Sequence, residues 1–200
     1  KAVERNARVV TLSDSDGFIF CEEGLQEEHI EFAHDLKETK RGRVSEMADK
    51  FDGIEFHKDA RPWGVKCDVA MPCATENELE EDGAKSLIDN GVMAVCEGAN
   101  MPTTTEAAQL FREKGVLHAP GKASNAGGVA VSGLEQSQNS MRISWSRQEV
   151  DERLRNIMTD IHDRCVEYGE GEDEKVNYVD GANIAGFEKV AKAMLAYGVV

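Results

Sequence analysis

Four segments of this chain are crowded with the small and polar residues that binding loops use. They read SDSDG at residues 13–17, MPCATENEL at 71–79, EGANMPTT at 97–104 and GKASNAGGVAVSGLEQSQNS at 121–140. Small residues let another group approach the backbone closely, and a helix that begins in such a segment offers free N–H groups to an anion or an amide. The last segment is equally compatible with a helix packed closely on its neighbour, so the rest of the chain has to distinguish binding from packing.

The acidic pair Asp14 and Asp16, just before Gly17, is the first charged candidate for chemistry. The spacing is that of a calcium loop, but position twelve of that loop would be Leu25 instead of the required Glu. Two interpretations therefore remain open. The segment is either a plain turn or the end of a strand at which a polar group meets the ribose of adenosine.

A basic cluster is the second charged candidate, and it is unusual in so acidic a chain. Its members are Lys37, Lys40, Arg41 and Arg43. Basic residues are favourable near the C-terminus of a helix, which is one explanation. The other is a phosphate-binding pocket, because charged nitrogen donors bind phosphate oxygens strongly.

Alternating strands and helices are expected to position these groups. Strands are predicted at residues 7–12, 54–56, 65–71, 92–96 and 116–119, and helices at 25–40, 44–51, 82–90 and from Thr103 to Gly115, the last with a capping box between Thr103 and Glu106. This order predicts an α/β fold with a Rossmann-like, mainly parallel sheet and helices on both of its faces. The loops after residues 12, 71, 96 and 119 then meet at one edge, where such folds bind ligands, and this favours a binding role for residues 121–140.

Two long helices are predicted after the alternation stops, at residues 146–168 and 182–197, with a capping box between Ser146 and Glu149 and a charged loop at 169–175. They predict a helical annex at 145–200 that covers another domain or a partner, beside a Rossmann-like domain at 1–144. The first residues resemble the tail of a helix that runs into a strand. We therefore expect the first strand and first turn of the fold to precede Lys1.

Composition excludes several classes of function. A net charge of −15 over 200 residues argues against nucleic-acid binding, and there is neither a membrane-spanning run nor a secretory signal pattern. The five cysteines form no C-x-x-C pair, so we expect reduced thiols, no metal site and a cytoplasmic location. His118 and His162 each stand alone and are interpreted as structural or surface residues.

The segments PCATENEL, EGANMPTT, GKASNAGGVAVSGLEQSQN and DGANIAGF together resemble the C-terminal half of the hexameric glutamate dehydrogenases, in order and over essentially the whole chain. The similarity is greatest to the NADP-linked type within the Glu/Leu/Phe/Val dehydrogenase family. It implies the coenzyme-binding domain of an enzyme of nitrogen assimilation that interconverts L-glutamate with 2-oxoglutarate and ammonia. It also implies a homo-hexamer and an N-terminal domain of the same polypeptide, on which the C-terminal helices would pack.

The resemblance assigns roles to individual cofactor-binding residues. Ala74, Thr75 and Asn77 correspond to the family's loop beside the cofactor. Asn100 and Asn125 correspond to amides near the nicotinamide and its ribose. These five residues are expected to contact the coenzyme.

The resemblance also places part of the substrate site in residues 121–140. Val129 and Ser132 correspond to substrate contacts, with the Ser132 hydroxyl directed at the side-chain carboxylate. The family's catalytic lysine and its acidic partner lie in the upstream domain, so no catalytic residue is expected here and the chain alone should not turn over. Lys122 is considered as a replacement, but it is as easily a surface charge.

The choice of coenzyme depends on charge. Asp14 favours NAD, because an acid repels a 2′-phosphate. Ser15, Lys37, Lys40 and Arg43 favour NADP, because they can bind that phosphate. The balance favours NADP over NAD.

Two alternatives to a glutamate dehydrogenase stay open. A dehydrogenase for an apolar amino acid is disfavoured by Ser132, whose hydroxyl would face an apolar side chain. A non-catalytic nucleotide-binding or scaffold module is distinguished by the mass of the native polypeptide, which should be near twice that of this chain for the enzyme.

Overall fold

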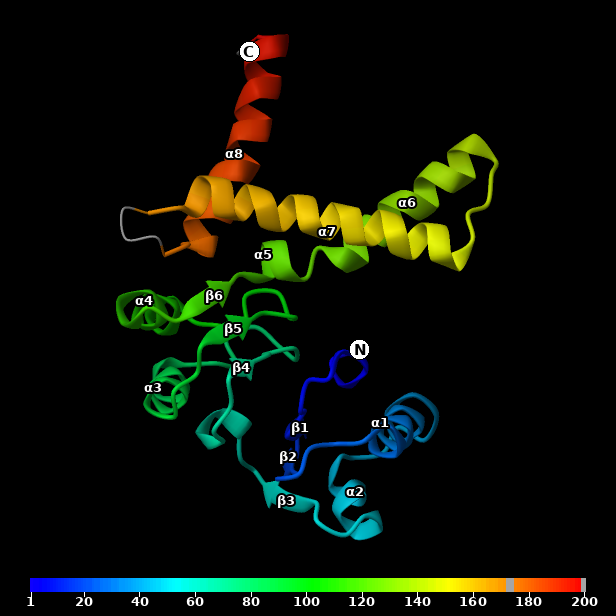
Figure 1. Cartoon of the computed structure of the whole chain (residues 1–200), viewed down its shortest axis with the longest axis vertical. Coiled ribbons are helices and arrows are strands. Elements are labelled where there is room, and N and C mark those ends of the chain that lie inside the picture. Colours follow the sequence, from blue (N-terminus) through cyan, green and yellow to red (C-terminus); the bar gives the residue numbers. More distant parts are fainter. Residues whose placement is uncertain (172–174, 199–200) are drawn as a thin grey trace. The chain divides into compact units, whose positions relative to one another are not determined.

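The computed structural model describes residues 1–171 and 175–198, which form two compact units, Lys1–Val65 and Lys66–Val200 (Figure 1). This division falls well before residue 144, because the strands on either side of Val65 belong to different sheets. The assignment of residues 1–144 and 145–200 to two functional domains stays a prediction. Residues 172–174 of the charged loop predicted at 169–175 lie outside the described residues.

The first unit is built on an antiparallel sheet in the order β1-β2-β3. Its elements are η1 (Val3–Arg5), β1 (Thr11–Asp14), β2 (Gly17–Phe20), α1 (Glu27–His34), the π-helical turn η2 (Asp35–Thr39), α2 (Ser45–Lys50), β3 (Glu55–Lys58) and η3 (Pro62–Gly64). Asp14 pairs with Gly17, so β1 and β2 form a tight hairpin. The expectation of parallel strands is wrong here, because a two-residue connection permits only antiparallel pairing.

A hydrophobic cluster holds the helices of this unit against β2. Ile19, Leu36 and Met47 are completely buried, and each comes from a different element. Burying an aliphatic side chain of this size contributes about 1.5–3 kcal/mol. The burial of Leu36 fixes η2, and with it the position of Lys37, relative to the hairpin.

The second unit begins with a parallel sheet in the order β4-β5-β6, as the alternation of strands and helices predicts. Its strands are β4 (Val69–Ala70), β5 (Ala94–Cys96) and β6 (Leu117–Ala119), and its crossover helices are α3 (Glu81–Asp89) and α4 (Thr105–Lys114). The two crossover helices pack side by side (Figure 1). Their buried residues Leu87 and Phe111 join Val95 of the central strand in the core. The predicted α/β class with a parallel sheet is therefore confirmed.

The helix cap predicted at Ser146 is confirmed, whereas the cap predicted at Thr103 lies one residue too early. Ser146 and Glu149 form the predicted capping box. At α4 the cap is Thr104, whose hydroxyl accepts from the Ala107 amide 3.3 Å away, and not the predicted Thr103. Thr103 is instead buried and lies in a β-bridge with Leu79, so tertiary pairing displaced the start of the helix.

The remaining helices of the second unit are α5 (Gly121–Ser124), α6 (Gly127–Met141), α7 (Arg147–Gly169) and α8 (Tyr178–Tyr197). Helices α7 and α8 cross closely, because a Cβ atom on Gly181 would lie 2.0 Å from the Cys165 carbonyl oxygen. The rest of α8 extends away from α7 (Figure 1) and exposes large apolar side chains, including Phe187 and Leu195. None of the helices described is both long and apolar enough to cross a membrane.

Candidate functional site

Backbone hydrogen bonds join the loops that follow β4 and β5. The Gly98 amide donates to the Pro72 carbonyl over 2.9 Å, the Asn77 amide to Met101 over 3.0 Å, and the Leu79 amide to Pro102 over 2.9 Å. Main-chain contacts of this kind do not depend on side-chain rotamers. The two loops therefore form a single frame at the carboxyl edge of the parallel sheet, where α/β proteins bind ligands.

Two residues in this frame have left-handed backbone conformations. Asn77 has φ of 55° and Met101 has φ of 51°, and the latter is exposed although apolar. Left-handed geometry in a residue other than glycine costs of order 1–3 kcal/mol and is concentrated at ligand clamps and active sites. The strain is consistent with loops held in a fixed shape for binding.

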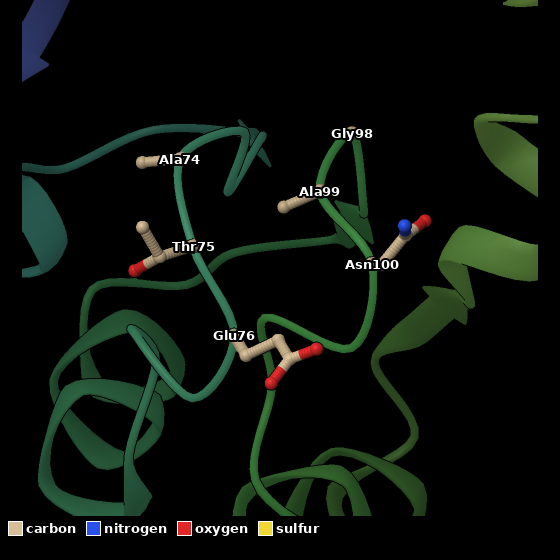
Figure 2. A pocket seen from close by; sticks show the side chains of 6 residues that line it. All are labelled: Ala74, Thr75, Glu76, Gly98, Ala99 and Asn100. Carbon is tan, nitrogen blue, oxygen red and sulfur yellow. The ribbon is translucent and has the colours of Figure 1, made fainter.

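An open pocket of about 360 Å³ lies between these loops (Figure 2). Its lining residues are Ala74, Thr75, Glu76, Gly98, Ala99 and Asn100. Figure 2 shows the Glu76 carboxylate extending toward the loop that carries Asn100. The structure thus brings together three of the predicted cofactor residues, while Asn77 lies in the same loop but outside the lining.

Asn125 joins the site from a more distant part of the chain, directly after α5. Its Nδ2 donates to the Asn100 Oδ1 over 2.8 Å and to the carbonyl oxygens of Gly98 and Ala99 over 3.2 Å each. This geometry directs the NH₂ group of Asn125 at the loop and leaves the Asn100 NH₂ group and the Asn125 amide oxygen to interact with a ligand. A donor and an acceptor side by side are what a carboxamide requires.

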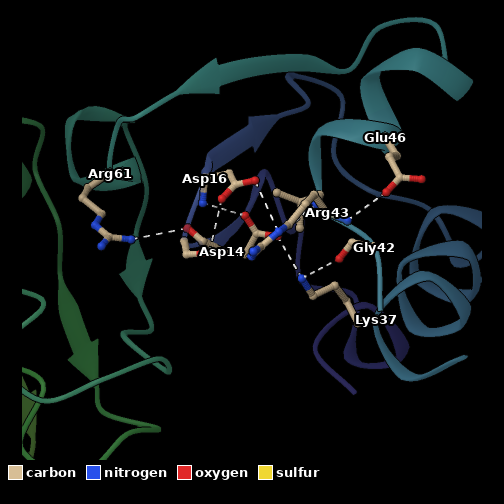
Figure 3. Close-up of polar contacts among 9 residues, drawn as sticks. Asp14, Asp16, Lys37, Gly42, Arg43, Glu46 and Arg61 are labelled. Atoms are coloured by element: carbon tan, nitrogen blue, oxygen red, sulfur yellow. Dashed lines mark hydrogen bonds and ion pairs between the residues drawn. The ribbon is translucent and has the colours of Figure 1, made fainter. Parts of the chain in front are cut away.

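The first unit holds a separate polar network around Asp14 (Figure 3). The Asp14 Oδ2 lies 2.8 Å from the Lys37 Nζ and 3.0 Å from the Val44 amide nitrogen, and its Oδ1 lies 3.1 Å from the Asp16 amide nitrogen. Partial burial acts to raise the pKa of Asp14, but the hydrogen bonds from Lys37, Val44 and Asp16 outweigh it, so the pKa lies below its ordinary value. Asp14 is therefore ionised at neutral pH.

Arg43 extends this network on its exposed side. Its Nη1 donates to the Ser15 hydroxyl over 2.5 Å and its Nε lies 3.3 Å from the Asp16 carboxylate. Lys40, the remaining predicted phosphate ligand, is not part of this network: it pairs with Asp35 at 2.7 Å and its ammonium lies 5.4 Å from the centre of the Phe32 ring. The network around Asp14 thus combines three of the predicted basic and polar residues but leaves Lys40 apart.

The predicted substrate residues lie on the first turns of α6. Val129 is exposed, and the Ser132 hydroxyl donates to the Gly128 carbonyl of its own helix over 3.3 Å. Neither is among the residues that line the pocket. Lys122 is exposed and donates to Asn183 of α8, which fits the interpretation of a surface charge.

Several residues of the site were missed in the sequence. Glu76 lines the pocket, and Glu97 is buried beside His118, which the sequence interpretation had standing alone. His118 does not stand alone, because its Nε2 lies 2.9 Å from the Glu97 Oε1, but its burial agrees with the structural role expected for it. The available signal was a histidine inside an apolar strand, since a buried polar group needs a partner.

Parallel strands with strained, polar loops at their carboxyl ends define an α/β protein built to bind a ligand at that edge. Within that class the comparison with known proteins is specific. The model of the Glutamate/Leucine/Phenylalanine/Valine dehydrogenase family matches residues 1–198, and the chain belongs to this family.

Its relatives include a glutamate dehydrogenase of Bacteroides thetaiotaomicron and an NADP-specific glutamate dehydrogenase of Escherichia coli. The chain is 54% and 55% identical to them over 200 residues, with all of this chain aligned to 45% and 44% of theirs. The crystal structure of Plasmodium falciparum glutamate dehydrogenase matches with a TM-score of 0.94 at 44% identity, covering 99% of this chain and 43% of that one. The chain therefore spans less than half the length of these relatives, and its placement in the C-terminal half of such an enzyme stays a prediction.

Proposed function

We propose that this chain is the coenzyme-binding part of a glutamate dehydrogenase that interconverts L-glutamate with 2-oxoglutarate and ammonia and prefers NADP. The observation that carries the proposal is the hydrogen-bonded pair Asn100–Asn125 beside the pocket at the edge of the parallel sheet. The similarity to glutamate dehydrogenases over the whole chain supports the substrate class.

The residues of the second unit fit a nicotinamide in their donor and acceptor groups. The Asn100 NH₂ group and the Asn125 amide oxygen would bind its carboxamide or the adjoining ribose, and the Thr75 hydroxyl would add a further polar contact. The bound coenzyme would supply the hydride acceptor or donor. The protein's task in this part of the site is to orient the ring, which lowers the barrier by fixing the reacting groups in advance.

The substrate contact is proposed at α6. The Ser132 hydroxyl currently donates to its own helix, and a rotation about χ1 would let it donate to a carboxylate instead. Gly128, one turn earlier, has open space beside it, because a Cβ atom there would meet no atom within 4 Å. The groups that transfer protons are proposed to lie in an N-terminal domain of the same polypeptide, on which residues 145–200 would pack. A homo-hexamer in the cytoplasm completes the proposal.

The preference for NADP rests on the network around Asp14. Arg43 already donates to Ser15 and its side chain is about half exposed, so it can bind a 2′-phosphate from solvent. The positive charge of Lys37 is balanced by Asp14, so the Lys37 ammonium group would have to donate to both Asp14 and the phosphate. Known relatives use both coenzymes: the Escherichia coli protein is NADP-specific, whereas one from Bacteroides fragilis, 52% identical, is NAD-specific.

The test is an assay of the complete polypeptide with 2-oxoglutarate and ammonia, with NADPH and NADH in parallel. We expect oxidation of both coenzymes to be measurable and kcat/KM to be higher with NADPH. Oxidation of neither would overturn the proposed activity, and a higher kcat/KM with NADH would overturn the coenzyme preference alone.

A further inference from the structure

We infer that Glu97 is a positioning residue that, oriented by His118, fixes the asparagine pair at the site. The inference rests on the proposed function, because the pair matters only if Asn100 and Asn125 bind the nicotinamide. Glu97 directly follows β5 and only 5% of its surface is exposed. A carboxylate that is so deeply buried is retained only where other groups stabilise its charge.

Both oxygens of the Glu97 carboxylate are engaged. Oε1 lies 2.9 Å from the His118 Nε2, and Oε2 accepts from the Gly121 amide over 2.6 Å. Burial acts to raise the pKa of Glu97, but these hydrogen bonds outweigh it and hold the pKa below its ordinary value. The group is therefore an ionised acceptor at neutral pH, and hydrogen bonds to a charged acceptor are stronger than those to a neutral one.

Glu97 also holds the far end of α5 through its backbone. Its carbonyl oxygen accepts from the Ser124 hydroxyl over 2.5 Å, and its amide donates to Ala119 over 3.1 Å. Helix α5 has only four residues, so a single residue of the preceding loop contacts both its first and its last position. Such a short helix has little stability of its own and takes its position from these contacts.

The position of α5 determines the position of the Asn125 backbone. Asn125 is the residue directly after α5, and its side chain reaches the carbonyl oxygens next to Glu97 and the amide of Asn100. The chain packs tightly here, because a Cβ atom on Gly121 would lie 2.5 Å from the Ala99 carbonyl oxygen and 3.3 Å from the Asn125 Nδ2. A shift of α5 would therefore be transmitted to the asparagine pair.

His118 orients the carboxylate from the neighbouring strand β6. Its Nδ1 is buried and finds no hydrogen-bond partner among the described residues, whereas its Nε2 faces Glu97. A proton on Nδ1 would be buried without an acceptor, so the proton that the ring donates is on Nε2. The ring also lies 5.8 Å from that of Phe111 in the core, which restricts its orientation.

The first test is Glu97→Gln in the complete polypeptide, read out as affinity for NADPH and for 2′,5′-ADP, which lacks the nicotinamide. Glutamine has nearly the same volume as glutamate, but its NH₂ group would face either the His118 Nε2 or the Gly121 amide, and both of these are donors. One hydrogen bond would be lost, so α5 and Asn125 should move. We expect the Kd of NADPH to rise by about tenfold or more and that of 2′,5′-ADP to stay unchanged. Glu113→Gln, at an exposed carboxylate on α4, is the matched control and should change neither value.

The second test separates positioning from packing at His118. His118→Phe keeps a ring beside Phe111 but removes the donor, and should weaken NADPH binding as Glu97→Gln does. His118→Gln places an amide nitrogen near the position of Nε2 and should restore most of the affinity. A purely structural role would give the opposite order, because phenylalanine fits an apolar site better than glutamine.

Distinct outcomes overturn the inference and the proposed function. The inference is wrong if Glu97→Gln weakens NADPH and 2′,5′-ADP equally or changes neither, or if His118→Phe binds NADPH better than His118→Gln. Failure of the unaltered polypeptide to bind NADPH would instead overturn the proposed function. Should Glu97→Gln fail to fold, the order of the two His118 variants decides.

Discussion

The two units of this chain present polar groups by different physical means. In the first, the groups around Asp14 are charged side chains, and the sheet that carries them is antiparallel. In the second, the groups are amides, and backbone hydrogen bonds between two loops hold them at the edge of a parallel sheet. Charged side chains respond to salt, pH and competing ions, whereas backbone-bonded loops do not. The difference suggests a specificity site in the first unit and an orienting site in the second.

The strongest test of this contrast is Asn125→Ala, which removes three hydrogen bonds to the loop after β5. We expect kcat/KM with NADPH to fall by about a hundredfold, because misplacing an orienting group carries a cost of that order. Steady-state kinetics of the complete polypeptide measures the effect. The control is Asn139→Ala on the exposed side of α6. An equal loss of kcat/KM in that variant would show that the effect is not specific to Asn125.

The next largest effect is expected for Lys37→Glu in the first unit. It places a carboxylate against Asp14 and the 2′-phosphate, so the KM for NADPH should rise by about tenfold and the KM for NADH much less. Lys40→Glu is the matched control, since Lys40 pairs with Asp35 away from the network. An equal rise of the two KM values in Lys37→Glu would contradict binding of the 2′-phosphate at this site.

Salt should affect the two units unequally. Raising the ionic strength from about 0.1 M to about 1 M shortens the screening length from about 10 Å to about 3 Å. We expect the ratio of kcat/KM values for NADPH and NADH to fall severalfold, because only NADPH carries the 2′-phosphate. Parallel assays at the two salt concentrations test this, and a constant ratio would contradict an electrostatic origin of the preference.

The smallest effect concerns stability in acid. The pKa of Asp14 is lowered in the folded state, so its contribution to the free energy of unfolding is present above the unfolded pKa and lost as pH falls through the folded value. Asp14→Asn should therefore cost on the order of 1 kcal/mol at pH 7 and progressively less as the pH falls through the folded pKa of Asp14. Urea unfolding at pH 7 and over a series of acidic pH values measures this difference. A cost independent of pH would mean that the charge of Asp14 does not stabilise the fold.

Local patterns in the sequence were sufficient for much of the fold. The parallel strands around residues 94–96 and 117–119 follow from apolar runs between helices, and the Ser146 cap follows from its spacing to Glu149. The loops at residues 71–79 and 97–104 were recognised because polar residues directly follow strands. In each case the determinant lies within a few residues of the feature.

The hairpin β1–β2 shows why other features were missed. No strand is predicted at residues 17–20, yet they form the central strand of the first sheet. The burial of Ile19 depends on α1 and α2, which come later in the chain, so no local window contains the reason. The start of α4 moved by one residue for a similar reason, the distant pairing of Thr103 with Leu79.

The sequence by itself determined which residues could do chemistry: the amides, the basic cluster and the glycine-rich helix entry. Only the tertiary structure decided which of them act together. It paired Asn100 with Asn125, Asp14 with Lys37 and Glu97 with His118, and it left Lys40 paired with Asp35, apart from the network around Asp14. The physical reason is distance along the chain: each of the first three pairs is more than twenty residues apart and forms only when a sheet and its core bring two elements into contact.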